Sequence, residues 1–196
     1  MSLDHSIETP SGRMFDFDAP TQGMVDIDDI AAALSNIARF GGLTRYRYSV
    51  AEHACAVYYL VRDAGFPPEV CVAALHHDSH EAYLGDVPTP LKRLIKTEAP
   101  GVWEDLVARV DRAICAYLRL DPELFEHDAV KAADKLVLSY EAALLKPSGA
   151  AQCKEGWVKA KVDEVPEWAV AGWPPELAHN IFWSCNQEAL RACSPA

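Results

Sequence analysis

Three imidazoles and two carboxylates stand within six consecutive residues, from His76 to Glu81, and side chains of these types can bind a metal ion. The segment follows directly on an apolar run at residues 70–75, which predicts a helix with a buried face. Buried carboxylates are costly unless they are paired or bind a metal. We therefore predict that His77 and Asp78 are metal ligands. Glu81 should share the helical face of His77, because it follows four residues later.

Two further candidate ligands lie on other predicted helices. His53 and Asp134 each have apolar neighbours at helical spacing, so both side chains should face the core. A lone buried histidine is usually an ordinary core residue, but a buried aspartate needs a partner. One shared cation explains four such residues more simply than four independent exceptions do. The predicted ligands of one divalent metal ion are His53, His77, Asp78 and Asp134.

This ligand set narrows the choice of metal and the kind of site. Mixed nitrogen and oxygen ligands suit Mn, Co, Fe, Ni or Zn, and also Mg with added waters. They leave positions open for water and substrate, which is typical of catalytic rather than structural sites. His76 and His80 flank the site and are not predicted as ligands. A second His-Asp dipeptide, His127-Asp128, suits the start of a helix and is interpreted as structural.

Helical periodicity and capping signals predict a mainly α fold that positions these ligands. A capping box at Ser49 should start a helix that runs to Ala64. The next helix should begin at Pro67, carry the His/Asp cluster and end near Gly85. Further helices are predicted at about 26–40, 89–97, 103–120, 128–145 and 175–192.

The remaining segments complete a single predicted domain, residues 1–196, with its core at about 25–145. Residues 7–17 predict a short N-terminal β-hairpin. Residues 146–175 contain four prolines and three tryptophans with weak periodicity. We interpret this last segment as a long structured loop, a kind of segment that is often functional.

Composition and charge exclude several classes of protein. The chain is 50% hydrophobic and 24% charged, and no apolar run reaches the ~18 residues that a membrane span needs. The formal charge of −11 argues against a nucleic-acid polymer as partner. A metal and a few local cations can still attract a small anionic substrate. Six cysteines without a C-x-x-C pair, and no signal peptide, lead us to expect a cytoplasmic protein.

The order of the predicted ligands resembles that of the HD-domain metal-dependent phosphohydrolases, whose helical fold is then expected here. Arg39-Phe40 before the ligands, and Gly-Asp-Val-Pro-Thr-Pro at residues 85–90, extend the similarity over about residues 25–145. These features are similar to the bacterial 5'-deoxynucleotidases and to the phage-type triphosphohydrolases that act on dATP. A His-Asp dipeptide alone has low specificity, whereas the ordered set is specific.

The resemblance implies a role for each matching residue. It implies that the four ligands hold the metal and that Glu81 orients or deprotonates the attacking water. It also implies that Asp86 donates a proton to the leaving oxygen. Arg39 matches a phosphate-binding arginine, and Phe40 stands where the deoxynucleotidases have tryptophan. Lys92 is a further candidate phosphate contact.

The implied function is hydrolysis of (deoxy)nucleotide phosphate esters, as a 5'-deoxynucleotidase or as a dNTP triphosphohydrolase. Leu43 stands where these relatives tend to carry histidine, so the choice of nucleotide is left open. The resemblance also implies a homo-oligomer, and residues 181–183 are a candidate interface or part of the core. One alternative is a phosphohydrolase of other nucleotides, such as guanosine polyphosphates. The other is a catalytically inactive HD protein that senses nucleotides or acts as a scaffold.

Overall fold

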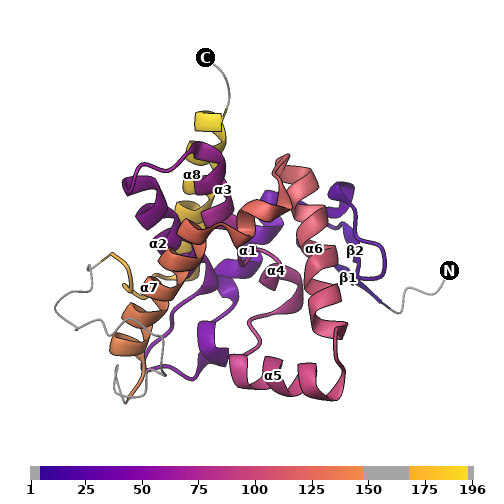
Figure 1. The fold of residues 1–196 in the computed structure, drawn as a ribbon, viewed down its shortest axis with the longest axis horizontal. Coiled ribbons are helices and arrows are strands. Elements are labelled where there is room, and N and C mark those ends of the chain that lie inside the picture. The colour runs from indigo at the N-terminus through magenta and orange to yellow at the C-terminus, as the bar shows by residue number, and fades with distance from the viewer. Residues whose placement is uncertain (1–4, 148–167, 194–196) are drawn as a thin grey trace.

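The computed structural model describes residues 5–147 and 168–193, which form a mainly helical molecule with one small sheet (Figure 1). The helices are α1 (Ile27–Asn36), α2 (Val50–Asp63), α3 (Pro68–His76), α4 (Glu81–Leu84), α5 (Thr89–Glu98), α6 (Val102–Leu118), α7 (Asp128–Leu145) and α8 (Pro175–Cys193). Short 3₁₀ segments are η1 (Gln22–Met24), η2 (Arg39–Gly42) and η3 (Pro122–Glu126). Strands β1 (Ser6–Glu8) and β2 (Met14–Asp16) pair antiparallel. The prediction of a mainly α fold with a short N-terminal hairpin is confirmed.

Helix α2 lies at the centre of the packing, against α3, α7 and α8. Every residue from Val50 to Tyr58 is buried, because neighbouring helices cover α2 on several sides. Helix α8 also packs against α1 and α3, so segments far apart in the sequence meet in one core (Figure 1). This packing fixes the backbone that carries His53.

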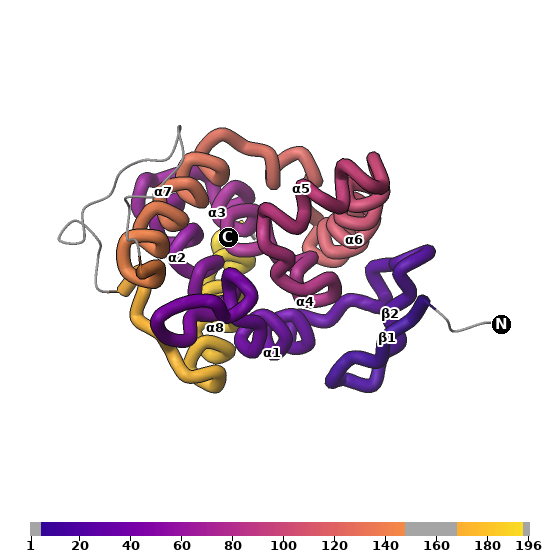
Figure 2. The backbone as a smooth tube through the Cα atoms, turned by 90° about the horizontal axis from the view of Figure 1, so that it is seen from below, coloured from indigo at the N-terminus to yellow at the C-terminus, as the bar shows by residue number. Residues whose placement is uncertain are grey.

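The hairpin lies at one end of the molecule, opposite α7 (Figure 2). Ile7 pairs with Phe15, whose side chain turns inward and is fully buried. The ring of Phe15 stacks on Tyr83 of α4, with the two centroids 3.8 Å apart. This aromatic contact attaches the sheet to the short helix that follows the His/Asp cluster.

The helix predicted at 26–40 ends early, at Asn36. The chain then becomes extended, and Ala38 pairs with Ser49 in an isolated β-bridge. Arg39 therefore lies in the tight turn η2 rather than in the last turn of a helix. The backbone pairing with the residue that caps α2 explains the break, and this contact is not visible in the local sequence.

The helix predicted to continue to Gly85 also divides in two. Helix α3 ends at His76, and residues 77–80 form a tight turn before α4 begins. Backbone hydrogen bonds in this turn span three residues, as between the N–H of Ser79 and the carbonyl of His76 at 2.9 Å. His77 and Asp78 therefore lie on a turn between two helices rather than on a continuous helix.

Residues 148–167, most of the predicted long loop, lie outside the described residues. The chain after them is fixed to α2 by Glu52, whose side chain is fully buried. The Glu52 carboxylate accepts hydrogen bonds from three consecutive backbone N–H groups, those of Ala171 (2.9 Å), Gly172 (2.6 Å) and Trp173 (3.1 Å). This anchor precedes α8, which matches the predicted C-terminal helix.

Three further expectations concern the thiols and the surface. The described cysteines are free thiols, and Cys153 lies outside the described residues. No helix in the described part of the chain is both long and apolar enough to cross a membrane. Within residues 181–183, Phe182 belongs to the core, whereas Trp183 is exposed. The homo-oligomer stays a prediction.

Candidate metal centre

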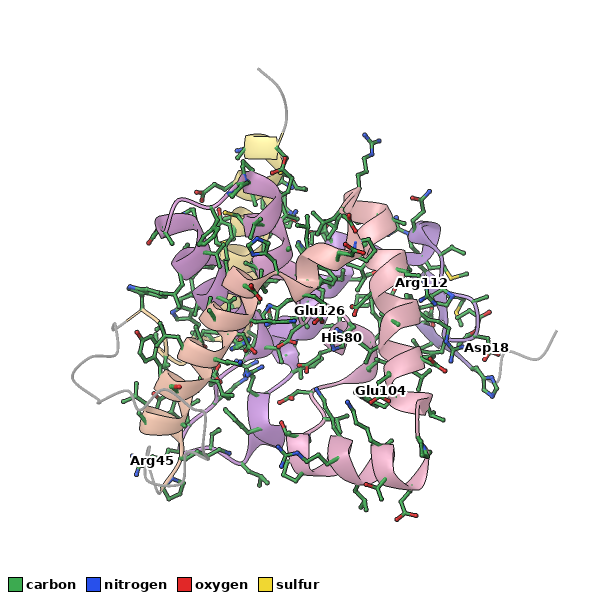
Figure 3. The ribbon with its side chains drawn as sticks, viewed as in Figure 1. Asp18, Arg45, His80, Glu104, Arg112 and Glu126 are labelled. Atoms are coloured by element: carbon green, nitrogen blue, oxygen red, sulfur yellow. The ribbon has the colours of Figure 1, made fainter. Side chains whose placement is uncertain are left out.

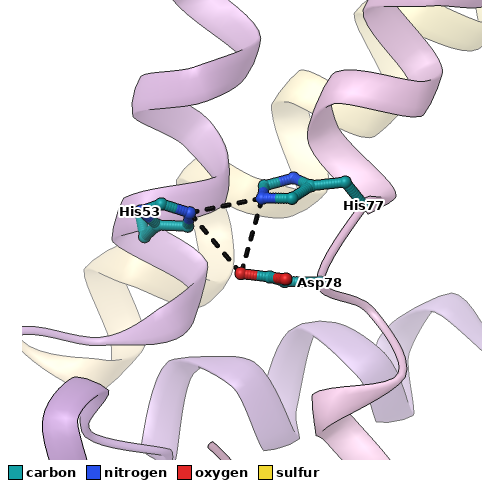
Figure 4. A group of neighbouring side chains, drawn as sticks. All are labelled: His53, His77 and Asp78. Carbon is teal, nitrogen blue, oxygen red and sulfur yellow. Dashed lines mark hydrogen bonds and ion pairs between the residues drawn. The ribbon is translucent and has the colours of Figure 1, made fainter. Parts of the chain in front are cut away.

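His53 of α2 and the turn that follows α3 bring three of the predicted ligands together (Figure 4). Nε2 of His53 is 3.3 Å from Nε2 of His77 and 3.5 Å from Oδ2 of Asp78. Nε2 of His77 is 3.4 Å from the same oxygen. One ligand atom from each residue lies within 4.8 Å of the other two, so this group could hold a metal ion.

Asp134 approaches the same group from α7. Its Oδ1 is 3.2 Å from Nε2 of His53 and 3.9 Å from Nε2 of His77. Four ligands arranged tetrahedrally at about 2.1 Å from an ion are about 3.4 Å from one another. The measured separations run from 3.2 to 3.9 Å. The structure therefore brings His53, His77 and Asp78 together as a group that could hold one ion, and it places Asp134 beside both imidazoles.

Charges of opposite sign act on these ligands. Burial raises the pKa of Asp78, but the two adjacent imidazoles and Arg39 outweigh burial and hold that pKa well below its usual range. Burial and Arg39 lower the pKa of His53, but Glu141 and Asp134 outweigh them and raise it to about 9. A histidine must be neutral at the ligating nitrogen to bind a metal. A metal ion bound at this site would therefore displace a proton from His53.

Glu141 of α7, a residue that sequence reasoning missed, lies behind His53. Its Oε1 is 2.7 Å from Nδ1 of His53, and the carboxylate is fully buried. Arg39 donates from Nη2 to Oε2 of the same group at 3.2 Å. A carboxylate that accepts the Nδ1 proton leaves Nε2 free to face a metal. The sequence does contain a signal for Glu141, namely its spacing. Glu141 follows Asp134 by two helical turns, so the two residues lie on the same face of α7.

Two known proteins are similar to this chain over most of its length. One is uncharacterized protein YfdR of Escherichia coli (strain K12), 38% identical over 135 residues, which cover 69% of this chain and 69% of the relative. The other is uncharacterized protein RCAP_rcc00048 of Rhodobacter capsulatus, 32% identical over 188 residues, which cover 94% of this chain and 95% of the relative. The chain belongs to their family, which we call the YfdR family. No family model matches the chain.

In this member of the YfdR family, Arg39 and Phe40 form a turn beside the predicted metal ligands. Arg39 is buried and donates from Nη1 to Oδ2 of Asp78 at 3.2 Å. Phe40 has φ of 58°, a left-handed conformation that bulky residues rarely adopt. Its N–H donates to Oδ2 of Asp86 at 2.5 Å, and its ring centroid lies 4.1 Å from Nζ of Lys146. Asp86, predicted as an acid, thus also holds this turn in place.

Glu81 and Lys92 are also brought to the site. Glu81 is 2% exposed, and its Oε1 accepts a hydrogen bond from Nζ of Lys92 at 3.2 Å. Burial and then the charge of Asp78 raise the pKa of Glu81 to about 7, against the opposing charges of Arg39 and Lys92. A carboxylate with such a pKa can exchange a proton near neutral pH, as a general base must.

His80 lies near the middle of the molecule in the view of Figure 3. Its Nδ1 is 3.1 Å from Oδ1 of Asp111 on α6. Asp78, His80 and Glu81 form a second group whose ligand atoms all lie within 4.8 Å of one another. The sequence placed His80 beside the site and gave no indication of its contact with Asp111, which lies 31 residues further along the chain.

His76 and His127 make hydrogen bonds that stabilise the fold. Buried His76 has Nε2 3.0 Å from Oδ1 of Asn186 and Nδ1 2.9 Å from Oγ of Ser79. Burial lowers the pKa of His76 to about 4, so its ring is neutral at ordinary pH. His127 starts α7, as the structural interpretation expects. Its Nδ1 accepts a hydrogen bond from the backbone N–H of Ala129 at 3.1 Å. The imidazole of His127, and not the carboxylate of Asp128, therefore caps the helix.

Proposed function

We propose that the protein is a metal-dependent phosphohydrolase that acts on phosphate esters of deoxynucleotides. The observation that carries this proposal is the group of His53, His77 and Asp78, which could hold one ion, with Asp134 beside both imidazoles. A guanidinium and a buried carboxylate lie beside that group. The resemblance in residue order to the HD-domain phosphohydrolases supports the choice of reaction. Both YfdR-family relatives are named uncharacterized proteins, so their names do not indicate an activity for this chain.

The four ligands would hold one divalent ion, and their chemistry fits Mn, Co, Fe, Ni or Zn, or Mg with added waters. When bound, such an ion would polarise a phosphoryl oxygen and make an attacking water more acidic. Burial opposes the ionisation of Asp78 and Asp134, but adjacent imidazoles keep the pKa of both carboxyls below the usual value. Both would therefore be ready to bind a cation at neutral pH.

Glu81 would accept the proton of the attacking water. Its carboxylate is held in place by Lys92 at 3.2 Å, and its pKa of about 7 allows it to take up and release a proton near neutral pH. The pKa of an unshifted glutamate would make it a weaker base. The burial that raises this pKa therefore favours the catalytic role.

Arg39 and Lys92 would bind the phosphate. The Arg39 guanidinium is held by Asp78 on one side and Glu141 on the other. A guanidinium has five N–H groups, so donors beyond these two contacts can reach phosphate oxygens. Because both sides are fixed, Arg39 would impose an orientation on the phosphate.

Phe40 would supply an apolar face for the base or sugar of the nucleotide. Its ring is packed against the Lys146 ammonium, and its backbone is held by Asp86. Asp86 has a second carboxylate oxygen, which we assign to proton donation toward the leaving oxygen. The left-handed backbone of Phe40 agrees with a functional position, since such conformations concentrate at binding sites.

The test is product analysis on a panel of ribo- and deoxynucleoside mono-, di- and triphosphates with added Mn²⁺ or Co²⁺. Asp78→Asn removes a metal ligand. Asp128→Asn is the matched control, because it changes the aspartate of the other His-Asp dipeptide, which is exposed at the start of α7. Inorganic phosphate from deoxynucleoside monophosphates, lost only in Asp78→Asn, would identify a 5'-deoxynucleotidase.

Release of intact triphosphate from a deoxynucleoside triphosphate would identify a triphosphohydrolase instead. Turnover of ribonucleotides alone would overturn the assignment of the substrate class. Metal-loaded protein that hydrolyses no member of the panel would overturn the proposed function. Such a result would favour a binding role or another phosphoester.

A further inference from the structure

We propose that the protein has a second divalent-cation site, formed by Asp78, His80 and Glu81, and that Asp78 is shared between two ions. This inference deepens the proposed function and rests on it, because the shared carboxylate belongs to the first site. It also changes the role of Glu81, which would bind a cation in the two-ion state.

The first argument is geometric. Asp78, His80 and Glu81 each offer one ligand atom, and these atoms lie within 4.8 Å of one another. Opposite ligands of an octahedral ion with bonds of about 2.1 Å are about 4.2 Å apart. The three groups therefore need only a small inward movement to contact one ion. Asp78 and His80 lie in the turn between α3 and α4, and Glu81 is the first residue of α4, so this short segment determines their spacing.

The second argument concerns a carboxylate oxygen without a partner. Oε1 of Glu81 accepts a hydrogen bond from Lys92, but Oε2 is buried and has no hydrogen-bond partner among the described residues. A buried polar atom in this state is destabilising unless something else satisfies it. The nearby guanidinium of Arg39 contacts Asp78 and Glu141 instead. A bound cation would supply the contact that Oε2 lacks.

The third argument is the orientation of His80. Its Nδ1 is 3.1 Å from Oδ1 of Asp111, which approaches from α6. When Nδ1 donates its proton to this carboxylate, Nε2 is left with a free lone pair, as in metal-ligating histidines that are supported by a carboxylate. The competing arrangement is a protonated imidazole paired with the surrounding carboxylates and no ion. The experiment below separates the two.

The chemistry of the two sites differs. The first site has two imidazoles and two carboxylates, whereas the second has one imidazole and two carboxylates. The second site is therefore expected to prefer harder ions such as Mg²⁺ or Mn²⁺. Two ions that share a carboxylate can stabilise both the attacking and the leaving oxygen of a phosphoryl displacement. A second ion would thus add to the reaction that we propose for the first site.

The test is a count of bound Mn²⁺. Metal-stripped protein is dialysed against increasing Mn²⁺, bound metal per chain is measured, and the saturated protein is examined by electron paramagnetic resonance. We expect two Mn²⁺ per chain with a magnetically coupled spectrum, since a shared carboxylate places ions about 3.5–4 Å apart. His80→Gln should bind one Mn²⁺ and lose the coupling. His179→Gln, which changes a histidine on α8 that neither group contains, is the matched control and should bind two.

Each of the other possible metal counts contradicts a specific part of the proposal. One Mn²⁺ in the unmodified protein, lost in His53→Ala, overturns the second site and leaves the first intact. Two Mn²⁺ in both the unmodified protein and His80→Gln place the second ion elsewhere and overturn the assignment. No bound Mn²⁺ at all counts against the metal centre of the proposed function as well.

A second variant covers the case in which His80→Gln does not fold, as judged by circular dichroism. Asp111→Asn keeps the shape of the side chain and all three proposed ligands, and acts only through the orientation of His80. We expect it to weaken binding of the second Mn²⁺ by about 10–100-fold and to leave the first unchanged. Equal affinity in Asp111→Asn and in the unmodified protein would overturn the proposed ligand role of His80.

Discussion

Nδ1 of His53 lies 2.7 Å from Oε1 of Glu141, and both side chains are fully buried. This contact joins a predicted metal ligand on α2 to the helix that carries Asp134. The same carboxylate also holds Arg39. One buried glutamate therefore orients both a predicted metal ligand and the guanidinium proposed to bind phosphate.

We expect Glu141→Gln to weaken metal binding by about 10–100-fold, because an amide holds the Nδ1 proton less strongly than a carboxylate does. The measurement is the dissociation constant of Co²⁺ from a spectroscopic titration. Glu98→Gln, at an exposed position at the end of α5, is the control for loss of one negative charge. Equal affinities in the two variants would show that Glu141 does not support His53.

Metal affinity should rise with pH. Without metal, His53 has a pKa of about 9, and its imidazole must lose a proton to bind the ion. Below that pKa each bound ion displaces one proton, so affinity should increase by about tenfold per pH unit and level off above about pH 9. Isothermal titration at several pH values, in buffers of different ionisation enthalpy, measures both the affinity and the number of protons released. A pH-independent affinity, with no proton release, would contradict the raised pKa.

Glu81→Gln should lower kcat by about 10²–10⁴-fold while KM changes little, as expected for loss of a general base. A base acts in its deprotonated form, so the rate of the unmodified protein should rise with pH through about 7 and then level off. The variant should lack that rise. The measurement is the pH–rate profile with one equivalent of metal per chain, so that Glu81 is free of the proposed second ion. A rise that persists in Glu81→Gln would assign it to another group.

His76 should make the fold less stable in acid. Burial lowers its pKa to about 4, whereas the unfolded chain has the ordinary value near 6.5. Between these values the unfolded state binds the extra proton, so the free energy of unfolding falls as pH falls from about 6.5 to about 4. The full loss is about 3 kcal/mol. Urea unfolding of metal-free protein across this range measures it, and His76→Gln should show a smaller slope whatever its stability at neutral pH.

Gly172→Ala should destabilise the protein more than Gly12→Ala does. Both glycines have positive φ, near 74° and 79°. A Cβ on Gly172 would lie 3.0 Å from the ring of Tyr46 and 3.2 Å from the carbonyl oxygen of Arg47, whereas none of the described atoms lies within 4 Å of a Cβ on Gly12. Backbone strain of about 1 kcal/mol is common to both variants, so their difference in thermal unfolding measures the close contact alone. Equal destabilisation would mean that the segment shifts to make room.

The sequence predicts the metal ligands from their residue types, and the structure brings three of them together as a group that could hold an ion. His53 is fully buried as its apolar neighbours predict, whereas the side chain of Asp134 is 37% exposed and faces the core only in part. The helix starts are equally local, since Ser49 caps α2 through a hydrogen bond to the N–H of Glu52. The same local reasoning predicts the hairpin and the bounds of α7.

Local sequence patterns do not predict features that depend on contacts between distant segments of the chain. The end of α1 depends on the pairing of Ala38 with Ser49, and the role of Asp86 in holding Phe40 depends on a contact across 46 residues. The support of His80 by Asp111 is of the same kind. Glu141 differs, because it follows Asp134 by two helical turns in the sequence itself, and this spacing places both residues on the same face of α7.

Glu52 and His53 are adjacent on α2, and they face different parts of the molecule. Glu52 holds the chain that emerges after residue 167, while His53 faces the other metal ligands. A pull on that chain therefore acts on the helical turn that carries His53. The Glu52 anchor thus links the helix that carries a predicted metal ligand to a segment more than 110 residues further along the chain.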